Sequence, residues 1–486
     1  MDISIKKLRS KSNSMSQEAK ASVAYTICSV LQKCLSIITM PLFTRLMSTE
    51  QYGEMTVYTS WTGLFSIILT FNLAYGSFSP AMLKFEKDRE GYVSSIQGIC
   101  IVLTCIFVAI YLPFTSLWNG LFKMSTLLVI LLIFETFAAN SINLWSGLRR
   151  FEYVYKPVVA LTLAMSIGST VVSVLAVLMS EETKKGSARI IGHAAVWIAI
   201  GLVIFIYSTV KGKKLFNKEY WSYALKFNVP LLAYYLSQMI FNQSDRIMID
   251  HYCGKGKAAI YGVAYTLAIM LTFVLNAINN SYVPWFYKKI KLGKEEENAK
   301  VSLGIAGIMA VLILSLVMVA PEVIRVMAGK EYLEAKWIIP PVAISLLLLF
   351  YAQLFINVQF YYEKKGKLVY ASVGAAVINI ILNALLIPSV SYIAAGYTTL
   401  VSYIIFAVMN YFTMKSVAKE ENFSLKALNI KGLILLFIVF SGLCFAIMAL
   451  YDFIIIRYAV IAVCGIICII KRRQVIAFVM KTIKHS

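Results

Sequence analysis

The sequence is a succession of apolar segments, separated by short connections that hold most of the charged residues. A helix of roughly 20 apolar residues crosses the hydrocarbon core of a bilayer. Uninterrupted apolar runs of this length predict helices, because barrel strands would alternate apolar and polar residues. We therefore expect an all-α polytopic membrane protein with about 14 transmembrane helices. The expected spans are residues 22–43, 56–80, 92–114, 121–142, 158–179, 190–210, 229–249, 260–283, 301–320, 338–361, 368–387, 393–412, 431–450 and 453–470.

Composition supports this class and decides how the positive charge is interpreted. The chain is 59% hydrophobic and only 14% charged, whereas a soluble domain carries about 25% charged residues. Its net charge of +22 therefore predicts basic cytoplasmic loops and no nucleic-acid partner. With the N-terminus inside, roughly three quarters of the Lys and Arg fall in inner connections. This distribution predicts that both termini are cytoplasmic.

A weak internal repeat suggests two similar halves. The motifs RLM, YG and SFSP between Arg45 and Lys84 return in the same order as RIM, YG and SYVP between Arg246 and Lys288. Six spans separate the copies, so both keep the same orientation, which predicts two six-helix lobes followed by two C-terminal helices. We expect an N-lobe at 1–216, a C-lobe at 217–414, and two additional spans with a basic tail at 415–486.

Two neighbouring spans in the middle of the chain carry more polar side chains than a lipid-exposed helix tolerates. In each span these side chains follow helical spacing and form one stripe. Because polar groups facing lipid are costly, we expect both stripes to face protein or a water-filled cavity. The candidate site residues from these stripes are Gln238, Asn242, Asp245 with the adjacent Arg246, and then Asn276 and Asn280.

A lysine in the middle of the first span is the most unusual charge in the chain. Lys33 lies too deep to reach the interface easily, so it needs a cavity or an acidic partner. Glu135, in the fourth span and close to Asn140, is the natural candidate partner. The sequence leaves two roles open for Glu135, namely a protonatable coupling group or a helix–helix ion-pair partner.

Several arginines could extend a positively charged passage. Arg45 and Arg246 fall near the outer ends of their spans, and Arg149 and Arg150 near the inner end of theirs. The planar guanidinium suits phosphate and carboxylate oxygens, although anchoring at the interface is the alternative for each arginine alone. Together with Lys33 they predict a cationic passage for an anionic substrate.

Amide side chains add polar stripes to the tenth and eleventh spans, where hydrogen bonding between helices is the alternative to lining a passage. These residues are Gln353, Asn357, Asn379 and Asn383. The cysteines and histidines show no metal-ligand spacing, and the sequence GKGK at 254–257 lacks the pattern of a phosphate-binding loop. We expect no metal site and no cofactor besides a possible coupling proton or sodium ion.

An ordered set of short motifs resembles the polysaccharide-transport branch of the multidrug/oligosaccharidyl-lipid/polysaccharide flippase superfamily, and within it the O-antigen and capsular repeat-unit flippases. The resemblance covers about residues 20–415, and residues 389–396 depart from it because they contain fewer small residues than the usual turn. The motifs are PLFTRL at 41–46 with EQYG at 50–53, VPLL at 229–232 with SDR at 244–246, IYG at 260–262, Pro284, and NIILN at 379–383 with IP at 387–388.

The resemblance implies a non-enzymatic flippase of the bacterial inner membrane. Such a protein moves an undecaprenyl-pyrophosphate-linked oligosaccharide from the cytoplasmic to the periplasmic leaflet by alternating access through a cationic cavity. Membrane lipids and the polymerase and chain-length machinery of the same pathway are the implied partners. Two alternatives stay open. An ion-coupled drug or cation antiporter of the same superfamily would favour acidic cavity residues, and a membrane polysaccharide polymerase would need larger outer loops than this chain has.

Overall fold

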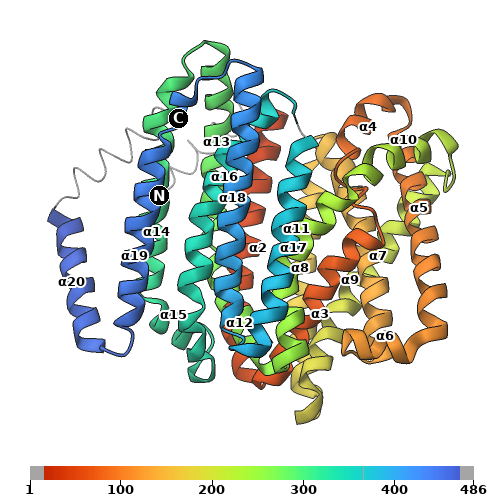
Figure 1. Ribbon diagram of the computed structural model, residues 1–486. Coiled ribbons are helices and arrows are strands. Elements are labelled where there is room, and N and C mark those ends of the chain that lie inside the picture. Colours follow the sequence, from red (N-terminus) through yellow and green to blue (C-terminus); the bar gives the residue numbers. More distant parts are fainter. Residues whose placement is uncertain (1–15, 365, 471–486) are drawn as a thin grey trace, which may run out of the picture. The chain divides into compact units, whose positions relative to one another are not determined.

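The computed structural model describes residues 16–364 and 366–470, and it contains α-helices and short 3-10 segments but no strand within these ranges (Figure 1). Eleven helices of this described part are long and apolar enough to cross a membrane. Each of the remaining three expected spans overlaps a helix, the second only in part: α3 (Thr49–Ile68), α11 (Leu232–Cys253) and α20 (Ile454–Ile470). The prediction of an all-α polytopic membrane protein is confirmed.

The chain divides into two compact units, residues 1–243 and 244–486. The boundary falls inside α11, whereas the sequence placed the lobe boundary after residue 216. Helix α10 (Lys218–Asn228) packs in the first unit, where Tyr220 and Ala224 join a core with Tyr92 and Ile96. The lobe limits drawn from the sequence stay a prediction.

The first unit is built around α9 (Lys185–Gly212), which packs against α7 (Thr126–Phe151) and α8 (Tyr155–Met179). Serine and aspartate side chains cap several of its helices, and Ser48 forms a full capping box with Gln51 at the start of α3. Its other helices are α2 (Gln17–Leu46), α4 (Phe78–Lys84), α5 (Arg89–Tyr111) and α6 (Thr115–Phe122).

The second expected span is not one helix. Helix α3 ends at Ile68, and the chain bends over residues 69–77 before α4 begins, so the prediction of a continuous span at 56–80 is wrong. Phe71 and Asn72 have φ values of 48° and 54°, in the left-handed region that interrupts a helix. Irregular backbone at membrane depth is tolerated where protein or a cavity surrounds it.

The second unit is built around α16, whose most apolar stretch is 83% buried and which packs along α18. The eighth expected span is also interrupted, since α12 ends at Ile269 and α13 begins at Thr272. The helices of this unit are α12 (Lys255–Ile269), α13 (Thr272–Lys291), α14 (Asn298–Met318), α15 (Ala320–Met327), α16 (Ile339–Tyr361), α17 (Gly366–Ser389), α18 (Ala394–Glu420), α19 (Ile430–Ala449) and α20.

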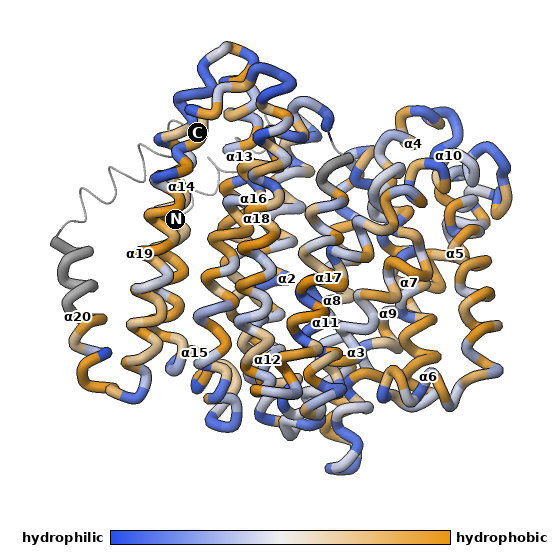
Figure 2. The backbone as a smooth tube through the Cα atoms, viewed as in Figure 1, coloured by the Kyte–Doolittle hydropathy of each residue, from blue (hydrophilic) through white to orange (hydrophobic). Residues whose placement is uncertain are grey.

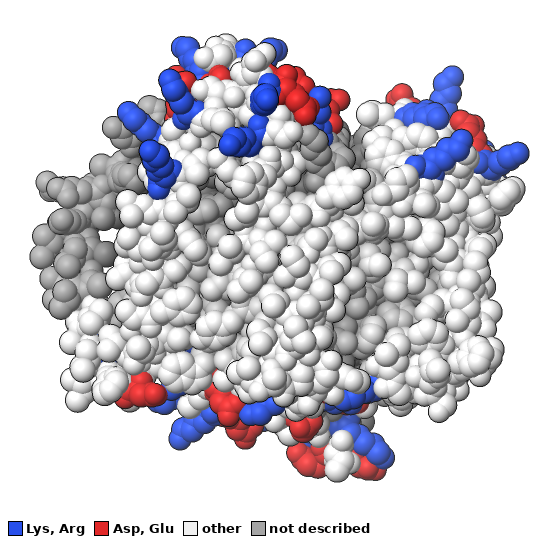
Figure 3. All heavy atoms as spheres, in the orientation of Figure 1, with Lys and Arg blue, Asp and Glu red and all other residues white. Residues whose placement is uncertain are grey.

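The distribution of charge within each unit fits a bilayer environment. The middle sections of the helices are mostly hydrophobic, and hydrophilic residues concentrate at their ends (Figure 2). On the visible face of each unit, the Lys, Arg, Asp and Glu side chains gather at two opposite ends, and the sides between them are white (Figure 3). A multi-pass membrane protein is expected to show this pattern, because buried charges in hydrocarbon are costly.

Glycines allow α9 to approach its neighbours closely. A Cβ atom added to Gly201 would lie 2.4 Å from the Cβ atom of Ala138 on α7. A Cβ atom added to Gly192 would lie 2.9 Å from the Cα atom of Ser173 on α8. Small residues at such crossings let membrane helices pack through their backbones.

We expect Gly201→Ala to destabilise the protein by about 1–3 kcal/mol, because the added methyl group overpacks the contact between α7 and α9. The matched control is Gly168→Ala on α8, whose added methyl group would meet only Val196, at 3.8 Å. The measurement is the melting temperature of the detergent-purified protein. Equal melting temperatures for the two variants would contradict the close crossing.

Candidate functional site

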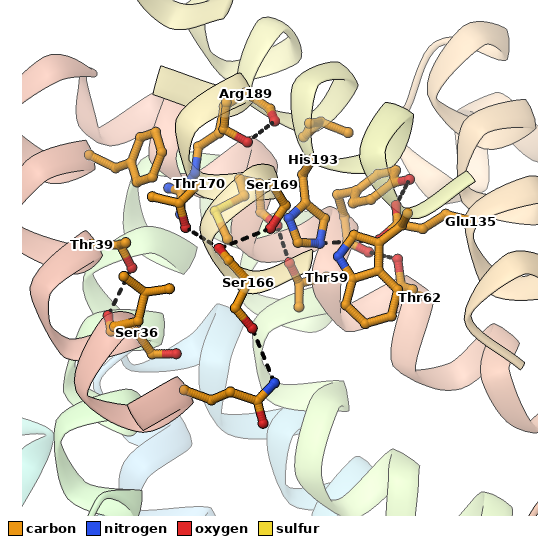
Figure 4. Close-up of a pocket in the computed structure, with 18 of the residues that line it drawn as sticks. Ser36, Thr39, Thr59, Thr62, Glu135, Ser166, Ser169, Thr170, Arg189 and His193 are labelled. Atoms are coloured by element: carbon orange, nitrogen blue, oxygen red, sulfur yellow. Dashed lines mark hydrogen bonds and ion pairs between the residues drawn. The ribbon is translucent and has the colours of Figure 1, made fainter. Parts of the chain in front are cut away.

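A polar cavity of about 380 Å³ lies within the first unit, between α2, α3, α7, α8 and α9 (Figure 4). Its most common lining group is the hydroxyl group of Ser and Thr. The hydroxyl-bearing lining residues, Tyr58 apart, are Ser36, Thr39, Thr59, Thr62, Ser166, Ser169, Thr170 and Ser173.

Helical spacing brings the hydroxyl groups of α8 to the cavity. Ser166, Ser169, Thr170 and Ser173 follow one face of that helix. Ser166 donates a hydrogen bond to the carbonyl oxygen of Thr162 at 2.9 Å and accepts one from Nε2 of Gln32 at 3.1 Å. Hydroxyl groups both donate and accept hydrogen bonds, so this face can exchange partners with a hydroxylated ligand.

Two basic side chains line the same cavity. Lys33 is exposed on α2, about halfway along that helix. Arg189, in the first turns of α9, is only 9% exposed, and its guanidinium carbon lies 3.6 Å from the ring centre of Phe43 and 5.3 Å from that of Tyr52. Cation–π contacts of this kind hold a guanidinium in place in a partly dry environment.

One carboxylate balances part of this charge. Glu135 is 6% exposed and accepts a hydrogen bond from the hydroxyl group of Tyr58 at 2.7 Å. Nε2 of His193 lies 3.5 Å from the same carboxylate, on the opposite oxygen. Figure 4 shows Glu135 and His193 side by side, near the hydroxyl groups of α8. Lys33 and Glu135, which the sequence suggested as partners, thus line one cavity, and the carboxylate is held by a phenol and an imidazole.

Two further cavities adjoin the first. One, of about 290 Å³, shares Gln32, Ser166 and Trp197 with it and is also lined by Arg150. The other, of about 350 Å³, shares Thr62 with the first cavity. The bend at residues 69–77 separates these two additional cavities, because Ala74 and Tyr75 line both.

Several predicted site residues of the first unit lie away from the first cavity. Asn140 and Gln238 line the third cavity, and Asn242 donates a hydrogen bond to the carbonyl oxygen of Gln238 at 2.7 Å. Arg45 is exposed in the last turn of α2. Arg149 lines none of the three cavities, because it forms ion pairs within the unit instead.

The second unit encloses its polar residues in a dense network. Asp245 is 1% exposed and accepts hydrogen bonds from Nδ2 of Asn383 at 2.6 Å, from Thr399 at 2.8 Å and from Tyr261. Asn379 accepts hydrogen bonds from Ser244 and from Asn383, both at 3.2 Å. The carboxylate is fully engaged by protein donors, which favours a structural role for these residues.

The other predicted residues of the second unit are dispersed. Arg246 is 7% exposed, with its guanidinium carbon 4.2 Å from the ring centre of Tyr265. Asn276 and Asn280 are exposed on α13. Gln353 accepts a hydrogen bond from Asn279, and Asn357 is half-buried one turn further along α16. Lys33 and Arg246 belong to different units, and their predicted common passage stays a prediction.

Sequence reasoning missed the contribution of α9. Arg189, His193 and Trp197 all line the first cavity, although none of them was among the candidate residues. The spacing of four residues between them was the available signal, since it places them on one helical face. The hydroxyl stripe of α8 was a second signal of the same kind.

We expect Asp245→Asn to lower the free energy of unfolding by about 1–3 kcal/mol, because an amide group would face donors that now point at a carboxylate. The control is Asp452→Asn, which removes a 2.7 Å ion pair with Lys336 at an aspartate that is 68% exposed; exposed pairs of this kind contribute little. Thermal unfolding of the purified variants provides the measurement. A larger loss for the Asp452 variant would contradict a structural role of the network.

Comparisons with known proteins agree with this architecture. A family model described as "Polysaccharide biosynthesis protein" matches residues 19–290. The Lsg locus protein 1 of Haemophilus influenzae is 22% identical over 391 residues, which cover 77% of this chain and 92% of that protein. An uncharacterized membrane protein of the same organism is 23% identical over the same length.

Two solved structures share the fold at low sequence identity. The lipid II flippase MurJ in an inward closed conformation matches with a TM-score of 0.61 and 16% identity, covering 90% of this chain and 100% of that chain. An inward-facing multidrug resistance transporter of the MATE family and MOP superfamily matches with a TM-score of 0.58 and 13% identity, covering 82% and 99%. Since the family match spans more than half of the sequence, the chain belongs to the polysaccharide biosynthesis protein family, in agreement with the resemblance carried by its motifs.

Proposed function

We propose that this protein is a flippase that moves an undecaprenyl-pyrophosphate-linked oligosaccharide, an O-antigen or capsule repeat unit, from the cytoplasmic to the periplasmic leaflet of a bacterial inner membrane. Membership in a polysaccharide biosynthesis family and a fold shared with a lipid II flippase support this proposal. The observation that carries it is the cavity of about 380 Å³ in the first unit, which combines a hydroxyl-rich wall with Lys33 and Arg189.

The chemistry of this cavity suits each part of such a substrate. Serine and threonine hydroxyl groups can replace the water that leaves the sugar hydroxyls. The ammonium of Lys33 and the guanidinium of Arg189 can offset the charge of the pyrophosphate, which would otherwise be prohibitively costly to move through hydrocarbon. The lipid tail needs no protein site of this kind, because it can stay in the bilayer.

The size of the cavities also fits a stepwise passage. A volume of about 380 Å³ suits a small ligand, so a longer oligosaccharide would extend into the adjoining cavities of about 290 and 350 Å³. Alternating access would then expose these cavities to one side of the membrane at a time. Both termini would lie in the cytoplasm, and the polymerase and chain-length machinery would receive the product.

An ion-coupled drug or cation antiporter is the second candidate, favoured by one observation. Glu135 is a buried carboxylate at the cavity wall, with Tyr58 and His193 as its neighbours. In the flippase proposal the same group can carry a coupling proton, and a sodium ion is the alternative coupling ion. The balance of two permanent cations, Lys33 and Arg189, against this one carboxylate favours an anionic substrate. Neither role requires catalysis by this chain, and a polymerase is the weakest alternative.

We expect Lys33→Ala to lower surface polysaccharide at least about tenfold, because a charge-assisted contact of about 1.5–3 kcal/mol is lost from the transport path. Protein level in the membrane should stay normal. The measurements are immunoblotting of membranes, gel analysis of surface polysaccharide and, in spheroplasts, labelling of lipid-linked saccharide on the periplasmic side. The control is Lys184→Ala, which removes a lysine that is 68% exposed and paired with Glu181 at the start of α9.

Lys33→Glu serves as a second variant, since it repels the pyrophosphate outright. Normal surface polysaccharide in both Lys33 variants would remove this cavity from the transport path. A deletion strain separates the remaining classes of function. Lipid-linked units retained on the cytoplasmic side support a flippase, whereas unpolymerised units that reach the periplasm would support a polymerase.

A further inference from the structure

Two adjacent arginines at the end of α7 have opposite surroundings. Arg149 is neutralised twice, by Glu90 at 2.6 Å and by Glu152 at 2.7 Å. Arg150 lines the second cavity, and its guanidinium carbon lies 5.3 Å from the ring centre of Tyr25. Among residues 16–364 and 366–470, no carboxylate oxygen lies within 4.0 Å of the Arg150 nitrogens. Carboxylates therefore occupy the guanidinium of Arg149, whereas the guanidinium of Arg150 lines a cavity.

The second cavity presents polar groups beside this guanidinium. Asn143 and Ser146 precede Arg150 by seven and four residues and lie on the same face of α7. Gln32 and Ser166, on the opposite wall, are joined by a hydrogen bond of 3.1 Å. Amide and hydroxyl groups can donate hydrogen bonds to anionic oxygens, so the wall complements the positive charge.

The bend at residues 69–77 lines this cavity and is itself tightly packed. Tyr75, which is 62% exposed, lines the cavity from the bend. Gly76 has a φ of +23°, and a Cβ atom there would lie 2.2 Å from Oδ1 of Asn228 and 2.7 Å from the hydroxyl oxygen of Tyr235. Glycine adopts such a positive φ without steric cost, and the space beside it is too small for any other side chain. The contacts with Asn228 and Tyr235 therefore fix the position of the bend that lines the cavity.

Arg150 is also distant from the other guanidinium of the cavity system. It lies in the last turn of α7, and Arg189 lies in the first turns of α9. The 25 residues of α8 connect these two helix ends, and a helix of that length spans about 37 Å. Lys33 lies on the first cavity, which meets the second at Gln32, Ser166 and Trp197. One anionic group thus cannot contact Arg150 and Arg189 at once.

We propose that Arg150 and the cavity it lines form a separate diphosphate-binding subsite, while the adjoining hydroxyl-lined cavity takes the saccharide. A guanidinium can bind phosphate oxygens with two parallel hydrogen bonds, and Arg150 has no competing carboxylate nearby. The charged part of one amphiphilic substrate would then bind in one cavity, and its hydroxylated part in the adjoining cavity. This inference rests on the flippase function proposed above.

The test uses the full-length protein in nanodiscs and measures binding of undecaprenyl diphosphate, which carries no sugar, and of undecaprenol, which carries no charge. We expect Arg150→Gln to weaken undecaprenyl diphosphate binding about tenfold and to leave undecaprenol binding unchanged. Lys33→Gln should weaken undecaprenyl diphosphate binding less than Arg150→Gln does, because the diphosphate first binds beside Arg150 and meets Lys33 only as it moves through the first cavity. Arg150→Lys should recover part of the affinity.

The matched control is Arg325→Gln, which removes an exposed arginine from the last turn of α15 and should not alter binding of either lipid. Equal diphosphate affinity of the wild type and the Arg150→Gln variant would overturn the subsite but leave the proposed function intact. Equal weakening by the Arg150 and Lys33 variants would overturn the separation into two subsites. If the wild type bound undecaprenol as tightly as undecaprenyl diphosphate, the proposed function would fail together with the subsite.

Discussion

Every polar group at membrane depth must find its partner inside the protein, and the rest of this structure depends on that constraint. Backbone groups satisfy it by forming helices. Side-chain hydroxyl groups on α8 satisfy it by bonding to carbonyl oxygens of their own helix, as Ser166 and Thr170 do at 2.9 and 2.8 Å. Where the backbone leaves the helix, at residues 69–77, it borders two cavities and packs against Asn228 and Tyr235.

The two units meet this constraint in different ways. In the second unit polar groups bond to one another, and Asp245 receives hydrogen bonds from Asn383, Thr399 and Tyr261. The first unit instead arranges its polar groups around cavities, with Lys33 among their lining residues. The same kind of polar stripe in the sequence therefore forms a closed hydrogen-bond network in one unit and the wall of a cavity in the other.

Helical periodicity explains which structural features the sequence predicted and which features it could not predict. The apolar runs located the helices, because the length and hydropathy of a span are properties of the local sequence. Periodicity also placed polar residues on common faces, but it does not say which helix packs against a given face. Arg149 and Arg150 illustrate the limit: they are neighbours in sequence, yet ion pairs to Glu90 and Glu152 occupy only the first. The bend after Ile68 was missed because two of its left-handed residues, Phe71 and Asn72, are not glycines.

The bend also contacts the segment that connects α10 to α11. Asn228 is fully buried, and its Nδ2 atom donates a hydrogen bond of 2.6 Å to the hydroxyl oxygen of Ser77, directly after Gly76. Three residues of η4 (Val229–Leu231) then lead into α11, the helix that continues into the second unit. The hydrogen bond between Asn228 and Ser77 thus joins the cavity wall at residues 69–77 to the segment that leads into α11. A substrate that displaces Tyr75 would therefore also act on the segment that leads into α11.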